Sequence, residues 1–427
     1  MDGSSWGQGS AWMARLHDAS AHALYLHVPF CVRKCAYCDF ASRATQANDP
    51  LMAAYVGALR QQMREAHELG LLDGIQTAYV GGGTPTLVGA SLLASLVGDV
   101  RELAPGVAEL SCEANPDSLG DEVLQTLVRS GATRVSIGVQ SLNDAELQAL
   151  GRVHDARTAC ERVRAAVASG LDVSCDLMCA TPCQDDASWQ STLAQVAGLA
   201  VGHASVYPLQ LEEGTPLGER WADEGPAWND PEVQARRMEA AAAVLGDSGY
   251  VRYEVASYAR EGKVCRHNQA YWTGRPYLGL GVAASSMLTR EGYQRLRRAC
   301  VQLPVIDDDV SRVRLTVASG AQDIAREPAL EALRFDIELL DEAQAAAEDL
   351  MLGMRLSAGV GPELLGHARS TLGEARVDGA IASCVERDLA AWDGERLEPT
   401  HDGWLLGNEL YGTLWDLAPG EVREASA

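Results

Sequence analysis

The chain has 427 residues, a length that allows two or three domains or one barrel with an appended domain. Hydrophobic residues make up 47% of it, and its formal net charge is −24 at pH 7. Such an acidic surface repels a phosphate backbone, so we expect no nucleic-acid partner, and no apolar run is long enough for a transmembrane segment. The N-terminus lacks the basic start and apolar core of a secretory signal, and the eleven cysteines do not resemble a secreted disulfide framework, so we expect a cytoplasmic protein.

In chain order, residues 1–22 are polar and predict a flexible N-terminal tail. From residue 23 a short apolar run alternates six times with an amphipathic stretch, which predicts β/α units and a parallel sheet. Strands are expected at residues 23–28, 76–80, 109–113, 134–138, 173–178 and 204–209. Helices are expected at residues 50–69, 89–100, 121–129, 145–150, 156–168 and 187–199. Right-handed crossovers curl such a sheet into a full or partial barrel.

The expected fold class is therefore α/β, with a partial (β/α)6 barrel and its closing segment over residues 23–300. Beyond residue 289 the alternation is lost. Residues 301–330 predict an irregular linker, and residues 331–427 predict a mainly helical C-terminal domain that starts with one or two helices over 330–356.

Cys31, Cys35 and Cys38 follow the first predicted strand with the spacing C-x3-C-x2-C, and no fourth cysteine follows nearby. Three thiolates can hold three irons of a four-iron cluster and leave the fourth iron open to a second molecule. A structural site would normally close its coordination with a fourth ligand. The alternatives are a zinc knuckle or three buried thiols, but zinc pairs more usually repeat C-x2-C. The spacing therefore favours a [4Fe-4S] cluster.

Polar or glycine residues stand at the ends of the other predicted strands. The run YVGGGTPT follows the second strand, and its glycines allow the backbone to approach a ligand. Glu113 ends the third strand, Gln140 follows the fourth and Asp176 lies in the fifth. Strand ends of a βα barrel gather at one face, where ligands bind. Arg152 offers a fork suited to a carboxylate, although a helix cap for Glu113 and a surface ion pair for Arg152 are open alternatives.

The cysteine spacing is the signature of the radical S-adenosylmethionine (SAM) superfamily, and the chain resembles that superfamily here. The segments YLHVPFCVRKCAYCDF, GGGTPT, CEANPDS, RVSIGVQSL, LGRVH, HASVYPLQLEEGTPL and HNQAYW occur in this order. Together they closely resemble the HemW-type haem chaperones, a branch of the oxygen-independent coproporphyrinogen III oxidase family, over roughly residues 24–286.

This resemblance implies that SAM binds the open iron of the cluster and that an electron donor reduces it. It implies that haem is bound and passed to an acceptor, such as a respiratory haem protein, with a homodimer as one arrangement that the sequence leaves open. Cofactor-binding roles are implied for Tyr25, Tyr37, Gly82, Gly83, Thr84, Glu113, Gln140, Arg152 and Asp176.

The segment CRHNQAYW bears on haem directly. A neutral imidazole such as His267 can be an axial iron ligand, and the Tyr271 and Trp272 rings could stack on a porphyrin. Arg266 and Arg275 could meet the propionates. A packed cluster of histidine and aromatic rings is the alternative. In the HemW-type group HN-x2-YW is a suggested haem-binding motif, so the resemblance favours His267 as a haem ligand.

The chain also departs from the patterns that it resembles. The oxidases carry a further cysteine two residues after the third cluster ligand, where this chain has Phe40. That difference favours a haem chaperone over the alternative, an oxidative decarboxylase of porphyrin biosynthesis, and leaves open whether the protein is an enzyme. GLPGQ is replaced by ATPCQ at residues 180–184, and GAHS has no histidine counterpart near Ala284 and Ser285. Cys175, Cys179 and Cys183 are expected to be small buried thiols rather than a second metal site.

Overall fold

The computed structural model describes residues 20–221 and 225–427, so most of the expected N-terminal tail, residues 1–19, lies outside the described residues. The described chain forms two compact units. The barrel unit comprises residues 26–60 and 78–264, and the C-terminal unit comprises residues 20–25, 61–77 and 265–427. The expected boundaries at residues 300 and 330 differ from this division, because the chain changes unit after residues 25, 60, 77 and 264.

The barrel unit is built on a row of six strands that follow one another in chain order. From one side to the other these are β1 (Ala23–Val28, of which 26–28 belong here), β4 (Thr77–Gly82, from 78 on), β5 (Glu109–Ala114), β6 (Arg134–Gln140), β7 (Asp172–Cys179) and β8 (His203–Pro208). The pairs β5–β6, β6–β7 and β7–β8 are parallel. Antiparallel β10 (Ser257–Ala259) and β9 (Val251–Arg252) extend the row beyond β8. The expected partial (β/α)6 fold is confirmed.

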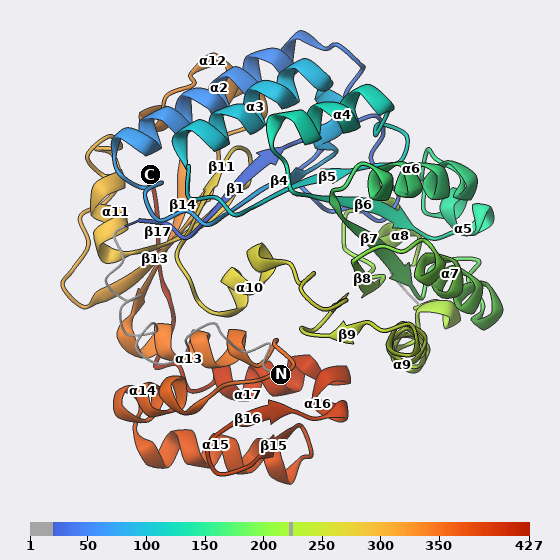
Figure 1. Cartoon of the computed structure of the whole chain (residues 1–427). Helices are drawn as coiled ribbons and strands as arrows, with labels where there is room; N and C mark the ends of the chain where they lie inside the picture. Colours follow the sequence, from blue (N-terminus) through green and yellow to red (C-terminus); the bar gives the residue numbers. More distant parts are fainter. Residues whose placement is uncertain (1–19, 222–224) are drawn as a thin grey trace. The chain divides into compact units, whose positions relative to one another are not determined.

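Helices connect these strands and cover their outer side. They are α2 (Pro50–Glu68), α3 (Ala90–Leu103), α4 (Asp121–Ser130), α5 (Asp144–Ala149), α6 (Ala156–Ala168), α7 (Asp186–Gly198), α8 (Pro216–Arg220) and α9 (Pro231–Asp247). Figure 1 shows α3, α4, α6 and α7 outside the row of strands. The buried residues of α3, which are Leu93, Leu96, Val97 and Val100, recur every three or four positions, the pattern of a helix with one apolar face.

The C-terminal unit contains an antiparallel sheet that the sequence did not predict. Its order is β17 (Arg423–Ser426), β14 (Phe335–Asp341), β13 (Val310–Val317), β12 (Ser285–Thr289) and β11 (Tyr277–Leu280). The expectation of an irregular linker at residues 301–330 is wrong, because β13, α12 (Ala321–Arg326) and the 3-10 turn Leu330–Ala332 lie there. Strand β13 was missed because it contains Arg312, a charged residue that is typical of the surface. The Arg312 side chain is in fact buried in the unit, where Glu348 and Asp349 bind it at 2.6 and 2.8 Å.

The rest of the C-terminal unit is mainly helical, as expected. Its helices are α10 (Arg266–Trp272), α11 (Arg290–Leu296), α13 (Glu342–Gly353), α14 (Pro362–Leu372), α15 (Glu374–Glu386), α16 (His401–Leu405) and α17 (Gly407–Trp415), with a hairpin of β15 (Ala390–Trp392) and β16 (Leu397–Pro399). Helices α13, α14, α15 and α17 share one apolar core, which includes Leu350, Leu365, Ile381 and Leu410. The expected helix over residues 330–356 begins only at Glu342, because β14 precedes it.

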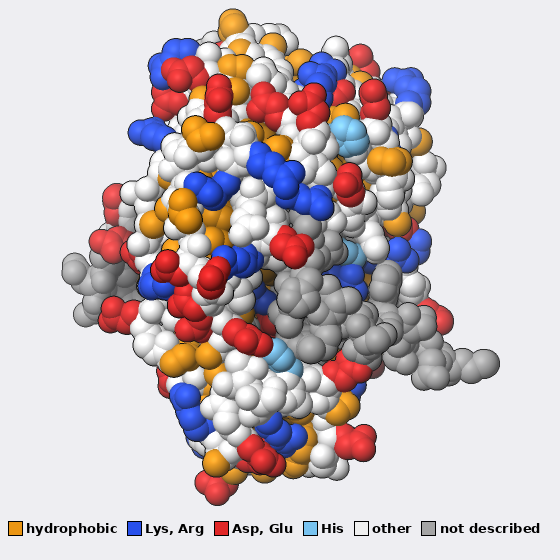
Figure 2. Space-filling model, turned by 90° about the vertical axis from the view of Figure 1, so that its left-hand side faces the viewer, with side chains coloured by type: hydrophobic (Ala, Val, Ile, Leu, Met, Phe, Trp, Pro, Cys, Tyr) orange, Lys and Arg blue, Asp and Glu red, His pale blue; other side chains and the backbone are white. Residues whose placement is uncertain are grey.

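Acidic side chains are spread over the face drawn in Figure 2, among arginines and lysines. Across the described ranges, no helix combines the length and the apolar character needed to cross a membrane.

The loop after β7 keeps a glycine-like backbone without glycine. Ala180 and Cys183, where the related pattern GLPGQ has glycines, have φ of +54° and +67°. Side chains hold this loop in place. The side-chain amide oxygen of Gln184, Oε1, accepts hydrogen bonds from the Ala180 backbone N–H at 2.8 Å and from Arg237 Nη1 at 2.6 Å. The left-handed conformation costs a residue with a Cβ about 1–2 kcal/mol. The loop therefore stores local strain.

Cys183→Gly is expected to raise the free energy of unfolding by about 0.5–1 kcal/mol. Relief of the left-handed strain exceeds the extra chain entropy of glycine, and the Cys183 side chain is exposed, so no core contact is lost. Urea unfolding of both proteins measures the difference. Ala194→Gly, at an exposed position inside α7, is the control and should lower the same free energy by about 1 kcal/mol. If both substitutions changed the free energy of unfolding in the same direction, the strain argument would be contradicted.

Candidate functional site

The cysteine loop begins at the short strand β2 (Phe30–Cys31), which pairs in parallel with β3 (Arg43–Ala44). Cys31, Cys35 and Cys38 are free and half-buried. Backbone hydrogen bonds attach the loop to other segments, from the Ala36 N–H to the Leu150 carbonyl at 3.1 Å and from the Leu217 N–H to the Ala36 carbonyl at 2.8 Å. Burial raises the pKa of the Cys31 and Cys38 thiols, so their thiolate forms need nearby positive charge.

The three cysteines of this loop are predicted to hold a cluster and not a single ion. Within residues 20–221 and 225–427, no three His, Cys, Asp or Glu side chains converge closely enough to hold one metal ion. A four-iron cluster makes a different demand, because each thiolate binds its own iron and the three sulfurs stay apart. The [4Fe-4S] ligands therefore stay a prediction, with the zinc knuckle as the alternative.

The glycine run at the end of β4 packs closely against the segment that leads into the cysteine loop. A Cβ on Gly83 would lie 2.9 Å from the backbone N and O of Phe30 and 3.0 Å from Cys31 Sγ. Gly82 has φ of +113°, and a Cβ there would lie 2.7 Å from His27 Nε2. Glycine at position 83 therefore lets the chain approach the first cysteine, and glycine at position 82 suits the positive φ and the close His27 ring.

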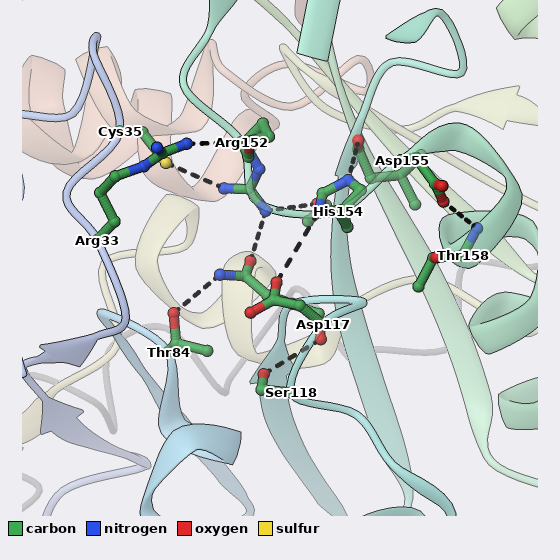
Figure 3. Close-up of polar contacts among 12 residues, drawn as sticks. Arg33, Cys35, Thr84, Asp117, Ser118, Arg152, His154, Asp155 and Thr158 are labelled. Carbon is green, nitrogen blue, oxygen red and sulfur yellow. Dashed lines mark hydrogen bonds and ion pairs between the residues drawn. The ribbon is translucent and has the colours of Figure 1, made fainter. Parts of the chain in front are cut away.

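A chain of polar side chains links the glycine run to the second cysteine (Figure 3). Thr84 Oγ1 lies 3.5 Å from Cys31 Sγ and accepts a hydrogen bond from Asn115 Nδ2 at 2.9 Å. Arg152 Nη2 donates to Asn115 Oδ1 at 2.6 Å and to the Gly138 carbonyl at 2.8 Å. Arg152 Nη1 lies 3.4 Å from Cys35 Sγ. The guanidinium thus places positive charge beside a predicted cluster ligand.

Two carboxylates lie on strands of the same unit, Glu113 near the end of β5 and Asp176 inside β7, with β6 between these strands. Glu113 Oε2 accepts the Gly82 N–H at 3.0 Å, and both oxygens of Asp176 accept from Ser136 Oγ at 3.0 Å. Burial, and then the charge of Asp176, raise the pKa of Glu113 to about 7. Burial also raises the pKa of Asp176 to about 6. Both groups would be stabilised by a cationic ligand, such as the ammonium or sulfonium of SAM.

Glu113→Gln is expected to stabilise the protein without SAM at pH 8. The folded-state pKa of Glu113 lies above the unfolded value near 4.3, so its ionisation favours unfolding, and this penalty grows as the pH rises from about 4 to 7. Glutamine removes the charge, so the gain should be on the order of 1–3 kcal/mol at pH 8 and should shrink toward pH 4. Urea unfolding at several pH values measures it. Glu122→Gln, at the exposed start of α4, is the control and should change the free energy of unfolding by less than about 0.5 kcal/mol. A gain in this free energy for Glu113→Gln that does not depend on pH would contradict the argument.

The remaining residues that were predicted to bind SAM are Gln140, Tyr37 and Tyr25, and the structure places them in different surroundings. Gln140 ends β6 with φ of +63°, a rare conformation for a residue with a Cβ. Tyr37, in the cysteine loop, packs against Leu150 and Met178. Tyr25 lies in β1 but falls in the C-terminal unit, so its role stays a prediction.

Asn115 is the residue that the sequence analysis missed. It joins Thr84 to Arg152, and its position directly after the end of β5 in CEANP was the available signal, because strand ends of a βα barrel gather at one face.

His267 of the predicted haem segment is hydrogen-bonded through both ring nitrogens within the C-terminal unit. His267 is 1% exposed. Its Nδ1 lies 3.0 Å from Thr77 Oγ1 and its Nε2 lies 2.9 Å from the Tyr271 hydroxyl. Burial lowers the His267 pKa to about 3, so the ring is neutral. The Tyr271 ring in turn meets Tyr277 edge-on, with centroids 4.7 Å apart. In this conformation neither ring nitrogen of His267 is available to iron.

Other sequence features also find their places. Arg275 Nη1 contacts the His22 ring at 3.0 Å, and Ser285, at the GAHS position, lies 2.9 Å from the Thr316 hydroxyl. Cys175 and Cys179 are buried as expected, whereas Cys183 is exposed.

Comparison with known proteins decides the family. The sequence pattern of the Radical SAM superfamily matches residues 25–196. The "Heme chaperone HemW" of Mycobacterium tuberculosis (strain ATCC 25618 / H37Rv) is 33% identical over 396 residues, which cover 92% of this chain and 94% of that relative. This chain belongs to the HemW family. The Bos taurus protein "Radical S-adenosyl methionine domain-containing protein 1, mitochondrial" is 34% identical over 348 residues, 79% of this chain and 74% of that relative.

The HemW-family chain also has the fold of a solved oxidase. The structure of coproporphyrinogen III oxidase (HemN) from Escherichia coli covers 96% of this chain and 93% of its own, with a TM-score of 0.73 and 20% sequence identity. At this identity the likeness shows a shared fold and nothing about activity. Membership in the superfamily implies a four-iron cluster and SAM, and the cysteine loop, Gly83 and the two carboxylates of this HemW-family chain fit both groups.

Proposed function

We propose that this protein is a haem chaperone, which binds haem as cargo and transfers it to an acceptor protein. The observation that carries the proposal is the similarity to a protein named as a haem chaperone over more than nine-tenths of both chains. We further propose that Cys31, Cys35 and Cys38 hold a [4Fe-4S] cluster, with SAM on its open iron. When reduced, such a cluster supplies an electron that can cleave SAM.

The residues around the cysteine loop would hold and orient these groups. Arg152 keeps positive charge beside Cys35, and Glu113 and Asp176 favour a cationic ligand. Gly83 lets the chain after β4 pack directly against Phe30 and Cys31, which would fix the cysteine loop beside the strand ends.

Haem titration of the anaerobically purified protein, with and without SAM, tests the proposal. We expect a saturable Soret band at one haem per chain, loss of that band to an added apo-haem protein, and no decarboxylation of coproporphyrinogen III. Formation of protoporphyrinogen together with 5′-deoxyadenosine would instead establish the oxidase alternative. Phe40 disfavours that outcome, because an exposed phenylalanine side chain stands where the oxidases have a thiol.

We retain His267 as the proposed axial ligand, with a specific requirement. Its Nε2 must give up the hydrogen bond to the Tyr271 hydroxyl before it can bind iron. The same titration with His267→Ala tests the assignment, and an unchanged haem affinity would contradict it. Tyr271→Phe, which frees Nε2 and keeps the ring, should bind haem at least as tightly as the unaltered chain.

A further inference from the structure

Arg355 is a cation without an anionic partner in a strongly acidic chain. It lies just beyond the end of α13, with Cζ 4.5 Å from the centroid of the Tyr411 ring and 5.2 Å from that of Trp272. Its Nε is buried and has no hydrogen-bond partner, and the described residues give its guanidinium no carboxylate. Its charge is therefore balanced by two aromatic faces alone.

Another arginine of the same unit shows the contrast. Arg369 lies over the Trp392 ring, with Cζ 5.6 Å from the centroid, and also binds Asp378 at 2.7 Å. Aromatic contact thus does not prevent an ion pair here. Arg355 differs from Arg369 in having the aromatic contacts without the carboxylate.

Trp272 supplies a second unsatisfied donor in the same cluster. Its indole Nε1 is buried and has no acceptor among the described residues. Buried N–H groups are nearly always hydrogen-bonded, so an acceptor from outside the described chain is the simplest complement to this one. Together Trp272 and Arg355 present donors and no acceptor, which selects for an anion.

We propose that Arg355, Trp272 and Tyr411 form a carboxylate-binding site, and that its ligand is a propionate of haem. This inference rests on the proposed haem-chaperone function. A guanidinium fork binds a carboxylate through two parallel N–H groups, and the flanking rings fix its plane. Trp272 lies on α10 five residues after His267, about 7.5 Å along the helix axis, so the iron ligand and the propionate site stand on one short helix.

The test compares haem with haem dimethyl ester, which lacks free carboxylates, by Soret titration of the full chain. Arg355→Gln is expected to weaken haem binding by roughly 10- to 100-fold, the loss of a charged hydrogen-bond pair, and to leave binding of the ester unchanged. Trp272→Phe keeps a ring and removes the N–H, and should weaken haem binding by about 3- to 10-fold. Arg369→Gln is the matched control and should bind haem normally.

The outcomes separate this inference from the chaperone proposal. Binding of haem by the unaltered chain with no preference over the ester, or equal haem affinity in Arg355→Gln, overturns the carboxylate site and leaves the chaperone proposal standing. No haem binding by the unaltered chain overturns both. Circular dichroism shows whether each variant is folded. If Arg355→Gln is unfolded, Arg355→Lys and Trp272→Phe test the carboxylate site in its place. Lysine keeps the charge without the guanidinium fork, so Arg355→Lys should still weaken haem binding.

Discussion

Cys35→Ala is expected to remove nearly all cluster iron and visible absorbance from the anaerobically reconstituted protein. Two thiolates remain, and an iron with no protein ligand is readily lost from a cluster. The substitution also takes away the sulfur that lies 3.4 Å from Arg152 Nη1 and leaves that guanidinium with one contact fewer. Iron and sulfide analysis with electron paramagnetic resonance of the reduced protein provides the measurement.

Cys160→Ala is the matched control for this variant. Cys160 is also a free, half-buried cysteine of the barrel unit, but it lies on α6 and belongs to no spacing pattern. Its replacement should leave the iron content unchanged. A cluster that survives Cys35→Ala, or one that is lost equally from both variants, would refute the assignment of the three ligands.

Gly83→Ala is expected to lower cluster content severely and to cost about 1–3 kcal/mol of stability. The added methyl group would lie 2.9 Å from the Phe30 backbone and 3.0 Å from Cys31 Sγ. Backbone atoms of a paired strand cannot move aside cheaply, so β2 and its cysteine must shift. Iron content after reconstitution and urea unfolding of the unreconstituted protein measure the two effects separately.

Gly98→Ala serves as the control for the added methyl group. Gly98 lies inside α3, and a Cβ there would meet no atom within 4 Å. Alanine should therefore stabilise the helix by up to about 1 kcal/mol and leave the iron content unchanged. If Gly83→Ala reconstitutes as fully as Gly98→Ala, the close packing of the glycine run against the cysteine loop is not needed for the cluster.

The barrel strands could be predicted from the sequence because they are buried on both sides and are separated by long amphipathic helices. Strands β1, β6 and β7 are buried along nearly their whole length, and each shows as a short segment rich in apolar residues although polar residues interrupt it. In the C-terminal unit the same approach failed. Strand β13 alternates arginine with valine and leucine, and its buried Arg312 looks like a surface residue until Glu348 and Asp349 are seen beside it.

The candidate site divides in the same way. The glycine run, Glu113 and Asp176 could be placed from sequence because each lies at or in a predicted strand, and strand ends meet at one face. Asn115 could not be assigned a role, since its importance depends on a hydrogen bond to Arg152, 37 residues away along the chain. The engagement of both His267 nitrogens likewise required the fold, because Thr77 lies 190 residues away.

The chain of contacts from Thr84 through Asn115 and Arg152 to Cys35 has a consequence for how the protein matures. It joins segments that follow β4, β5 and β6 to the cysteine loop, so none of these segments is ordered independently of the others. Cluster assembly and formation of a competent SAM site should therefore be one cooperative transition. Newly made protein that lacks iron is expected to bind SAM poorly. The iron supply would thereby set the amount of protein that can bind SAM.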